Sequence, residues 1–246
     1  MSIAETPAMK TALVLSGGGM FGAWQAGAWS ALAPVFQPDL VVGASVGSLN
    51  GYAIAAGWDP QELCDFWRHP LVAGGFSRLP EMIQALMAAR PLQIEYAAVL
   101  VDPLRMKPRT FAGPEITWRH LAASCAVPGM LPPQRIGGRW HLDGGLLNPL
   151  PVWAAVELGA TRIIALQALP EIPSALLKPF VRAFRAVFGH HPKLQSSVEL
   201  ITFEPNRPLG SLFDALYWKR ENIDRWLDQG RTDVLAAKKH LQLQMF

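Results

Sequence analysis

Short apolar runs recur along the first two thirds of the chain, and stretches with helical spacing lie between them. Runs of this kind, bounded by glycine or polar residues, predict buried strands. The sequence predicts three of them: Thr11–Ser16, Leu40–Val42 and Thr161–Leu166. Leu92–Val101 mixes strand and helix signals, and we interpret it as a strand. Gln134–Leu142 predicts a hairpin, because a glycine pair in its middle suits a tight turn.

Helices are predicted where apolar residues return every three or four positions. These stretches are Gly22–Leu32, Ser48–Ala56, Pro60–Trp67, Glu81–Arg90, Ile116–Ala126 and Val152–Leu158. Strands that alternate with helices favour an α/β fold with a central, mainly parallel sheet covered on both faces. No internal repeat or low-complexity linker interrupts the pattern, so a single domain is expected over residues 7–246. Its motif-bearing part covers residues 10–166, and residues 170–246 are expected to be helical.

Composition narrows the class of protein. Half of the 246 residues are hydrophobic and 17% are charged, yet no uncharged apolar run reaches the length of about 18 that a membrane span needs. Met1–Lys10 lacks the basic start of a secretory signal, so we expect a cytoplasmic protein with possible peripheral contact to a membrane. A net charge of +3 is too small to indicate nucleic acid. Cys64 and Cys125 are expected to be free, buried thiols, and no metal or cofactor is implied.

A candidate nucleophile follows the second predicted strand. The pattern GxSxG is matched by Gly43, Ala44, Ser45, Val46 and Gly47. In a strand–turn–helix elbow of this kind the serine occupies a strained turn that exposes its hydroxyl. The same five residues also suit a glycine-lined turn with a capping serine, and the motif alone does not separate the two interpretations.

A glycine loop follows the first predicted strand, with the residues Gly17, Gly18, Gly19, Met20, Phe21 and Gly22. It fits GxGxxG, but a dinucleotide site needs an acidic residue at the end of the next strand, and Asp39 lies before that strand. Successive backbone N–H groups at a helix start can instead stabilise the oxyanion formed during attack on an ester. A plain tight turn is the alternative, although three consecutive glycines exceed what it needs.

A serine nucleophile requires a neighbouring base. Asp143 directly follows the apolar end of the predicted hairpin and is followed by Gly144 and Gly145. In isolation such an Asp-Gly pair usually marks a turn. None of the six histidines stands beside glycine at a strand end, where catalytic groups of α/β sheets collect. His141, two residues before Asp143, is a supporting residue or a distant alternative base.

These motifs, in this order, resemble those of the patatin-like phospholipases: GGGxxG, GxSxG and DG[AG]. A fourth block of that family, Ala-Ser followed by proline, matches Ala123, Ser124 and Pro128. The resemblance covers roughly Lys10–Leu166. It implies a three-layer α/β/α sandwich and a Ser–Asp dyad without histidine. By that resemblance Ser45 attacks the acyl carbonyl and Asp143 accepts the proton. The amides of Gly17, Gly18 and Gly19 would hold the oxyanion.

The expected function is therefore a serine acyl-hydrolase that cleaves fatty-acyl esters of lipids or phospholipids. An acyltransferase with the same dyad is an alternative within this chemistry, although malonyl-type acyltransferases place a histidine where this chain has Ala44. A catalytically silent membrane-binding module is an alternative from another class. An aspartate base needs its pKa raised from about 3.9, which burial would achieve.

One further helix is expected at Ser174–Phe188. Its large apolar residues gather on one side, whereas Lys178, Arg182 and Arg185 fall on the other. This pattern suits a helix in an anionic membrane interface. Packing of the apolar stripe on the protein itself is the more common use of such a pattern, and we favour it.

Overall fold

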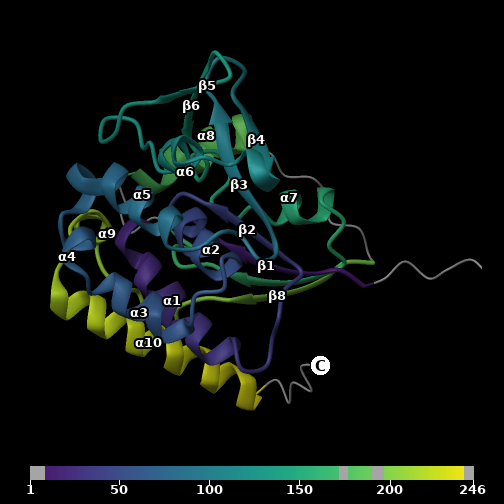
Figure 1. The fold of residues 1–246 in the computed structure, drawn as a ribbon, viewed down its shortest axis with the longest axis vertical. Coiled ribbons are helices and arrows are strands. Elements are labelled where there is room, and N and C mark those ends of the chain that lie inside the picture. Colours follow the sequence, from purple (N-terminus) through teal and green to yellow (C-terminus); the bar gives the residue numbers. More distant parts are fainter. Residues whose placement is uncertain (1–8, 172–176, 190–196, 241–246) are drawn as a thin grey trace, which may run out of the picture.

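A computed structural model describes residues 9–171, 177–189 and 197–240. Its eight described strands form a sheet in the order β5-β6-β3-β2-β1-β7-β8, with β4 also paired to β3 (Figure 1). The strands are β1 (Thr11–Leu15), β2 (Leu40–Ala44), β3 (Glu95–Asp102), β4 (Lys107–Ala112), β5 (Gln134–Ile136), β6 (Arg139–Asp143), β7 (Arg162–Leu166) and β8 (Glu199–Phe203).

The centre of the sheet is parallel, as the sequence predicts. β1 pairs in parallel with β2 and β7, β2 with β3, and β7 with β8, whereas β4 and β6 run antiparallel to β3. β1 and β2 are almost entirely buried on both faces, which explains their continuous apolar sequences. Because the strands are parallel, β1 and β2 end at one edge, with Leu15 beside Gly43. This edge carries the glycine loop and Ser45.

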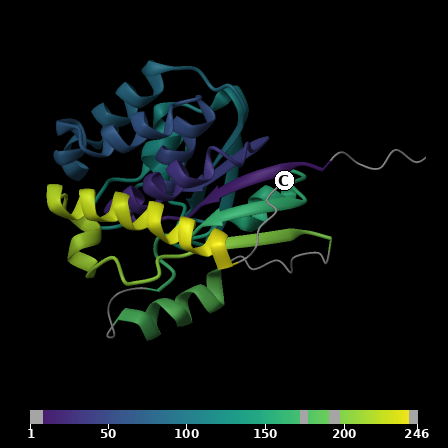
Figure 2. The same ribbon diagram turned by 90° about the horizontal axis from the view of Figure 1, so that it is seen from below.

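Helices cover both faces of the sheet. They are α1 (Gly22–Leu32), α2 (Val46–Ala55), α3 (Pro60–Trp67), α4 (Pro70–Ala73), α5 (Leu79–Ala89), α6 (Trp118–Ser124), α7 (Val152–Glu157), α8 (Leu177–Phe188), α9 (Leu212–Leu216) and α10 (Arg220–His240), with short 3-10 turns η1 (Gly19–Phe21), η2 (Gly75–Arg78) and η3 (Gly113–Glu115). One core joins β-sheet residues such as Leu13 to α1, α2, α3, α5 and α10, and a second joins Val14 to Trp153 of α7. These are the three layers expected (Figure 2).

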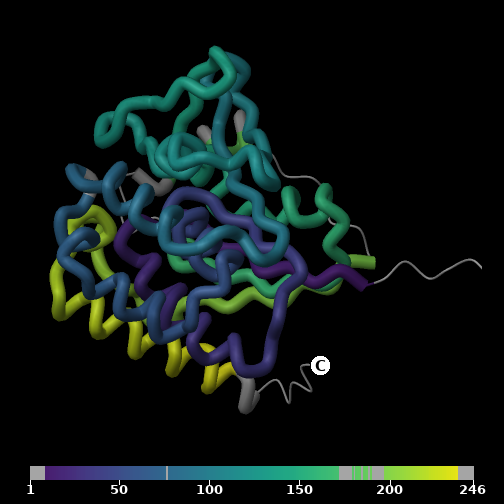
Figure 3. Tube along the Cα trace, in the orientation of Figure 1, coloured from purple at the N-terminus to yellow at the C-terminus, as the bar shows by residue number. Residues whose placement is uncertain are grey.

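The last helix packs closely on the first one. A side chain at Gly27 of α1 would collide with the carbonyl of Leu227, and one at Gly230 of α10 would collide with the backbone of Trp24. Glycine at both positions therefore lets the two backbones approach. Trp24 Nε1 also donates a hydrogen bond to Asp233 at 2.8 Å. Figure 3 shows α10 running along α1, although the two are far apart in the sequence.

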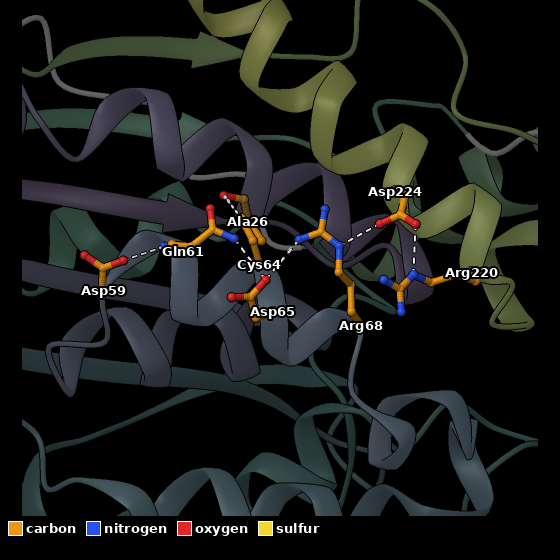
Figure 4. Close-up of polar contacts among 8 residues, drawn as sticks. All are labelled: Ala26, Asp59, Gln61, Cys64, Asp65, Arg68, Arg220 and Asp224. Carbon is orange, nitrogen blue, oxygen red and sulfur yellow. Dashed lines mark hydrogen bonds and ion pairs between the residues drawn. The ribbon is translucent and has the colours of Figure 1, made fainter.

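An arginine ties α3 to the same C-terminal helix (Figure 4). Arg68 Nε lies 2.6 Å from Asp224, and its Nη1 lies 3.1 Å from Asp65. The hydrogen bond from Arg68 lowers the pKa of Asp224. These groups are partly exposed, so solvent screens the pair and its contribution to stability is modest. Nearby, the Cys64 thiol donates to the carbonyl of Ala26; Cys64 and Cys125 are both buried and free, as expected.

The structure differs from the sequence-based expectation in three places. The C-terminal part is not purely helical, because β8 extends the sheet beside β7. β4 was not expected, since its sequence contains proline and polar residues, which an edge strand tolerates. α2 begins at Val46, directly after Ser45, rather than at Ser48.

The helix expected at Ser174–Phe188 is α8, which begins at Leu177; residues 174–176 lie outside the described ranges. Pro179 sits in its first turn, where a missing N–H is tolerated. In the part of the chain that the structure describes, no helix is both long and apolar enough to cross a membrane.

Candidate active site

Ser45 stands alone between the end of β2 and the start of α2. Its backbone has φ 54° and ψ −131°, a conformation that residues with a side chain seldom adopt. Such strain persists only where the surrounding structure imposes it, and it concentrates at functional sites. The turn here is held from both sides by a fully buried strand and a fully buried helix. The geometry matches a nucleophile elbow rather than an ordinary capped turn.

Ser124, at the end of α6, ties this turn to the loop that bears Asp143. Its hydroxyl accepts a hydrogen bond from the Ser45 N–H at 2.9 Å and donates to the carbonyl of Val99 at 2.8 Å. Its own carbonyl accepts from the Gly144 N–H at 3.2 Å. One buried residue thus fixes both loops. The sequence marks Ser124 only as part of a motif, and its role depends on contacts across 79 positions.

Asp143 ends β6, where it pairs with Leu100 of β3. The side chain is buried, and its Oδ1 accepts a hydrogen bond from the Gly145 N–H at 2.7 Å. Oδ2 makes no complete hydrogen bond with the described residues. The Ser45 hydroxyl is nonetheless close enough to the carboxyl to lower its pKa through hydrogen bonding. The structure therefore places Ser45 and Asp143 on the lining of one cavity and leaves one carboxylate oxygen without a hydrogen-bond partner among the described residues.

Burial raises the pKa of Asp143 from 3.8 to about 6. The nearby Ser45 hydroxyl, the hydrogen bond from Gly145 and the charge of Arg185 oppose this effect without cancelling it. The carboxyl is therefore a far better proton acceptor than an exposed aspartate, while it remains mostly ionised at neutral pH. This supplies the basicity that an aspartate base needs.

The glycine loop lies against Ser45. A Cβ built on Gly17 would lie 3.2 Å from the Cβ of Ser45. The Gly17 N–H already donates to the carbonyl of Pro149 at 2.9 Å, so it is not available to a substrate. The N–H groups of Gly18 and Gly19 have no acceptor among the described residues. Of the three amides expected to hold an oxyanion, only those of Gly18 and Gly19 are therefore free of a partner among the described residues.

Buried amides and hydroxyls hold the glycine loop in place. Gln25 donates to the carbonyl of Ser16 at 2.8 Å, and Asn50 donates to the carbonyl of Gly22 at 2.9 Å. Asn50 also donates to Gln25 at 3.0 Å and accepts from Trp67 at 2.9 Å. A satisfied buried network of this kind makes the loop rigid, so its N–H groups are fixed before a substrate arrives.

His141 does not join Ser45. Its Nδ1 lies 3.1 Å from the carbonyl of Arg139, and its ring packs edge-on against Phe111. Burial lowers its pKa. Neither of the two cavities that reach Ser45 has a histidine among its described lining residues. Asp143 is thus the only titratable base at hand in the described part of the site.

Two cavities meet at Ser45 and Gly19. The first is a narrow cavity of about 50 Å³ and is almost entirely apolar. Its lining comes from α2, α3, α4 and α5 and includes Leu49, Leu63, Trp67, Val72, Met82 and Leu86. The second is wider, at about 210 Å³, and is lined by the glycine loop, Asp143, Arg185 and the α9 residues Leu212, Ala215 and Leu216. Ser45 therefore lies between a narrow apolar cavity and a wider, more open mouth that contains Asp143 and Arg185.

Arg185 of α8 was expected on an outward cationic face with Lys178 and Arg182. Arg182 is exposed, but Arg185 is half-buried and donates to the carbonyls of Gly145 at 3.2 Å and Leu146 at 3.3 Å. It lines the wider mouth of the site. Helical periodicity predicts the face of α8 on which Arg185 lies, but only tertiary contacts show that this face is turned toward the site. No group of three potential metal ligands occurs among the described residues.

The chain thus combines a three-layer α/β/α sandwich with a strained serine turn, a buried aspartate and a glycine loop. The family model described as patatin-like phospholipase matches residues 13–105 and 90–156, which together exceed half of the chain. The chain belongs to the patatin-like phospholipase family.

Relatives and solved structures agree with this placement. An uncharacterised NTE family protein of Mycobacterium tuberculosis is 28% identical over 212 residues, which cover 73% of this chain and 58% of the relative. A lysophospholipase of Debaryomyces hansenii is 47% identical over 49 residues, covering 20% of this chain and 3% of that protein. This chain thus spans little more than half the length of its mycobacterial relative.

Two solved structures share the fold. VipD of Legionella pneumophila superposes with a TM-score of 0.59 at 14% identity, covering 96% of this chain and 67% of VipD. Human group IVD cytosolic phospholipase A2, in complex with methyl γ-linolenyl fluorophosphonate, gives 0.54 at 12% identity, covering 98% of this chain and 60% of that one. At such identities the likeness shows a common fold.

Proposed function

We propose that this chain is a serine acyl-hydrolase that cleaves a fatty-acyl ester of a phospholipid or lysophospholipid, with Ser45 as nucleophile and Asp143 as base. The observation that carries the proposal is the buried Asp143 carboxyl, with its pKa near 6, beside a serine on a strained elbow. Membership of the patatin-like phospholipase family and the lysophospholipase among the relatives support the substrate class.

The two cavities suggest how a lipid ester would bind. The apolar cavity beside Ser45 suits an acyl chain, because its lining would exclude water from the chain. The mouth that contains Arg185 suits the polar part of the substrate. The ester carbonyl would then lie between Ser45 and the free N–H groups of Gly18 and Gly19.

The proposed reaction has two halves. The Ser45 hydroxyl oxygen bonds to the acyl carbon while its proton moves to Asp143, and Gly18 and Gly19 hold the resulting oxyanion. The carbon–oxygen bond to the alcohol then breaks, and the alcohol takes the proton from Asp143. Water next attacks the acyl-enzyme and gives a proton to Asp143. The fatty acid departs, and the proton returns to Ser45.

The direct test is to incubate the purified chain with a lysophospholipid and measure free fatty acid, in parallel with labelling by a fluorophosphonate that carries an acyl chain. We expect fatty-acid release and a label on Ser45. If the chain shows no fatty-acid release and no labelling, the proposal is contradicted and a silent lipid-binding module is favoured. A label on Ser45 without any release would favour a transferase.

The two candidate oxyanion donors should respond differently to alanine. Gly19 has φ 58°, and a Cβ there would collide with the carbonyl of Ala215. Gly18 has φ 162°, outside the left-handed region, and its Cβ would meet Ala168 at 3.4 Å. We expect Gly19→Ala to lower kcat on a soluble ester by about 10²- to 10³-fold, and Gly18→Ala to lower it much less.

Gly159→Ala is the matched control for Gly19→Ala, because Gly159 also has positive φ but lies in open space at the end of α7. It should cost about 1 kcal/mol of stability and leave kcat unchanged. If Gly19→Ala turns over as fast as this control, the loop does not hold the oxyanion.

The charge of Arg185 should set the acid limit of activity. Below pH 6 Asp143 binds a proton and can no longer act as a base, so kcat/KM should fall as the pH drops through about 6. Arg185 lowers the pKa of Asp143, so Arg185→Gln should raise that pKa and move the limit to higher pH. Arg185→Lys keeps the charge and should move it less. Identical pH profiles for all three proteins would rule out this coupling.

A further inference from the structure

Positive charge concentrates in one part of the molecule. Residues 103–141 contain six arginine or lysine residues and one acidic residue, Glu115, whereas the whole chain carries a net charge of only +3. The remaining residues are therefore net negative by two. All six are exposed, and five lie in the β3–β4 turn, on β4 or in the β5–β6 hairpin: Arg105, Lys107, Arg109, Arg135 and Arg139. A segregation this strong creates a local field that the small net charge conceals.

Strand pairing brings the two hairpins together. β3 pairs with β4 up to Asp102 and Lys107, and on β3 the partner of Val101 is Leu142 of β6. Residues 139–141 therefore extend past the end of β3, beside the β3–β4 turn. The rings of Phe111 and His141 are in contact, which confirms the approach. Figure 1 shows both hairpins at the same end of the molecule, opposite α10. We name this end the hairpin surface.

Large apolar side chains project among these cations. Leu104, in the β3–β4 turn, is 85% exposed, and Trp140, on β6, is 48% exposed. A hollow beside the turn is lined by Leu104, Lys107, Arg109 and, across it, Glu157 of α7 and Val187 of α8, and Val187 is 72% exposed. Exposed leucine and tryptophan are costly in water, and apolar groups ringed by charge mark an interaction surface.

Few acidic groups offset this charge. Asp102 is buried, with its carboxylate 3.1 Å from Arg105, and Glu157 lies at the far side of the hollow. Tryptophan and leucine beside arginine and lysine are the composition that binds a lipid interface, where the rings enter the headgroup layer and the cations meet lipid phosphates. A nucleic-acid duplex would engage the cations through its phosphates but would leave Leu104 and Trp140 exposed, because its bases are already stacked.

We infer that the hairpin surface docks the protein on an anionic lipid surface. β6 runs from Trp140 directly to Asp143, so docking at the hairpin fixes the orientation of the active site relative to the membrane. The use of this docking rests on the proposed function, because a lipid hydrolase must reach substrate in a membrane. The binding itself does not depend on catalysis.

The test measures co-sedimentation of the protein with vesicles of phosphatidylcholine alone and of equimolar phosphatidylcholine and phosphatidylglycerol. The parent should bind only the anionic vesicles, and less at high salt. Each cation near such a surface strengthens binding about fivefold. The double variant Lys107→Glu/Arg139→Glu should therefore bind about thirtyfold more weakly or worse. Leu104→Ser/Trp140→Ser should lose binding that persists at high salt.

Arg207→Glu/Arg231→Glu is the matched control, because it makes the same change in net charge at exposed positions on or beside α10. It should bind vesicles within about threefold of the parent. The two hairpin double variants and this control should hydrolyse a water-soluble ester at the parental rate, which would show that their active sites are intact. Ser45→Ala should bind vesicles like the parent, so failure of catalysis and failure of docking are distinguishable.

Three results would overturn the inference. The first is that the parent protein does not co-sediment with anionic vesicles. The second is equal weakening by the hairpin charge variant and by the α10 control. The third is binding of duplex DNA as tight as binding of vesicles, with both lost in the hairpin charge variant, which would identify a nucleic-acid surface.

Discussion

Ser45→Ala should abolish ester hydrolysis and leave the fold unchanged. The substitution removes only the hydroxyl oxygen, and alanine meets the same positive φ as serine, so the strain of the elbow is not increased. Loss of a catalytic serine typically lowers kcat by roughly a millionfold. Release of p-nitrophenol from a short-chain ester, with the thermal midpoint measured alongside, checks both parts of this expectation.

Ser30→Ala is the matched control for this variant. Ser30 lies on α1, where its hydroxyl donates to the carbonyl of Gly27, and it lines neither cavity at Ser45. The control should hydrolyse the ester at the parental rate. Parental activity in Ser45→Ala would show that another residue is the nucleophile.

Asp143→Asn should lower kcat by about two to four orders of magnitude, because asparagine keeps the shape of the side chain but cannot accept the proton of Ser45. The same variant should be more stable than the parent at pH 8. Folding raises the pKa of Asp143 to about 6, so the stability that this group contributes is present at low pH and is lost as the pH rises through 6. A shift of this size corresponds to at most about 3 kcal/mol.

Asp102→Asn gives the contrasting result. Asp102 ends the neighbouring strand β3, where burial works to raise its pKa, but hydrogen bonds from Arg105 and Leu104 outweigh burial and hold the pKa below its usual range. This variant should lose stability at pH 8 and keep its activity. His141→Ala should also cost far less activity than Asp143→Asn. If His141→Ala were inactive and Asp143→Asn were active, the base would be His141, and the site would be a Ser–His pair.

Local sequence sufficed for the parallel core of the sheet and for its motifs. β1, β2 and β7 are almost continuous apolar runs, so consecutive residues are enough to predict that these strands are buried. β4 and β8 have no such signal. β4 contains a proline and alternates exposed with half-buried positions, and β8 has only one fully buried residue. Both exist because an existing sheet edge pairs with them, which is a tertiary cause.

The site shows the same division. Ser45 and Asp143 stand where their strands end, and sequence motifs mark those ends. Ser124 and Arg185 act through contacts that span many positions, and no local pattern assigns them a partner. The engagement of the Gly17 N–H depends on the carbonyl of Pro149, which lies in a distant loop. The residue types in the motifs therefore predict the kind of chemistry at the site, whereas contacts between distant parts of the chain determine how the site residues are arranged.

The close contact between α1 and α10 has a consequence for how the chain folds during synthesis. α1 is buried almost all round, and part of its cover comes from the last described helix. A ribosome therefore exposes the glycine loop and α1 long before their partner exists. Contacts this distant in sequence slow folding, and the uncovered apolar helix is a site for aggregation or chaperone capture in the meantime. Assembly of the catalytic loop would then be among the last steps of folding, so a truncated or stalled chain would be released without activity.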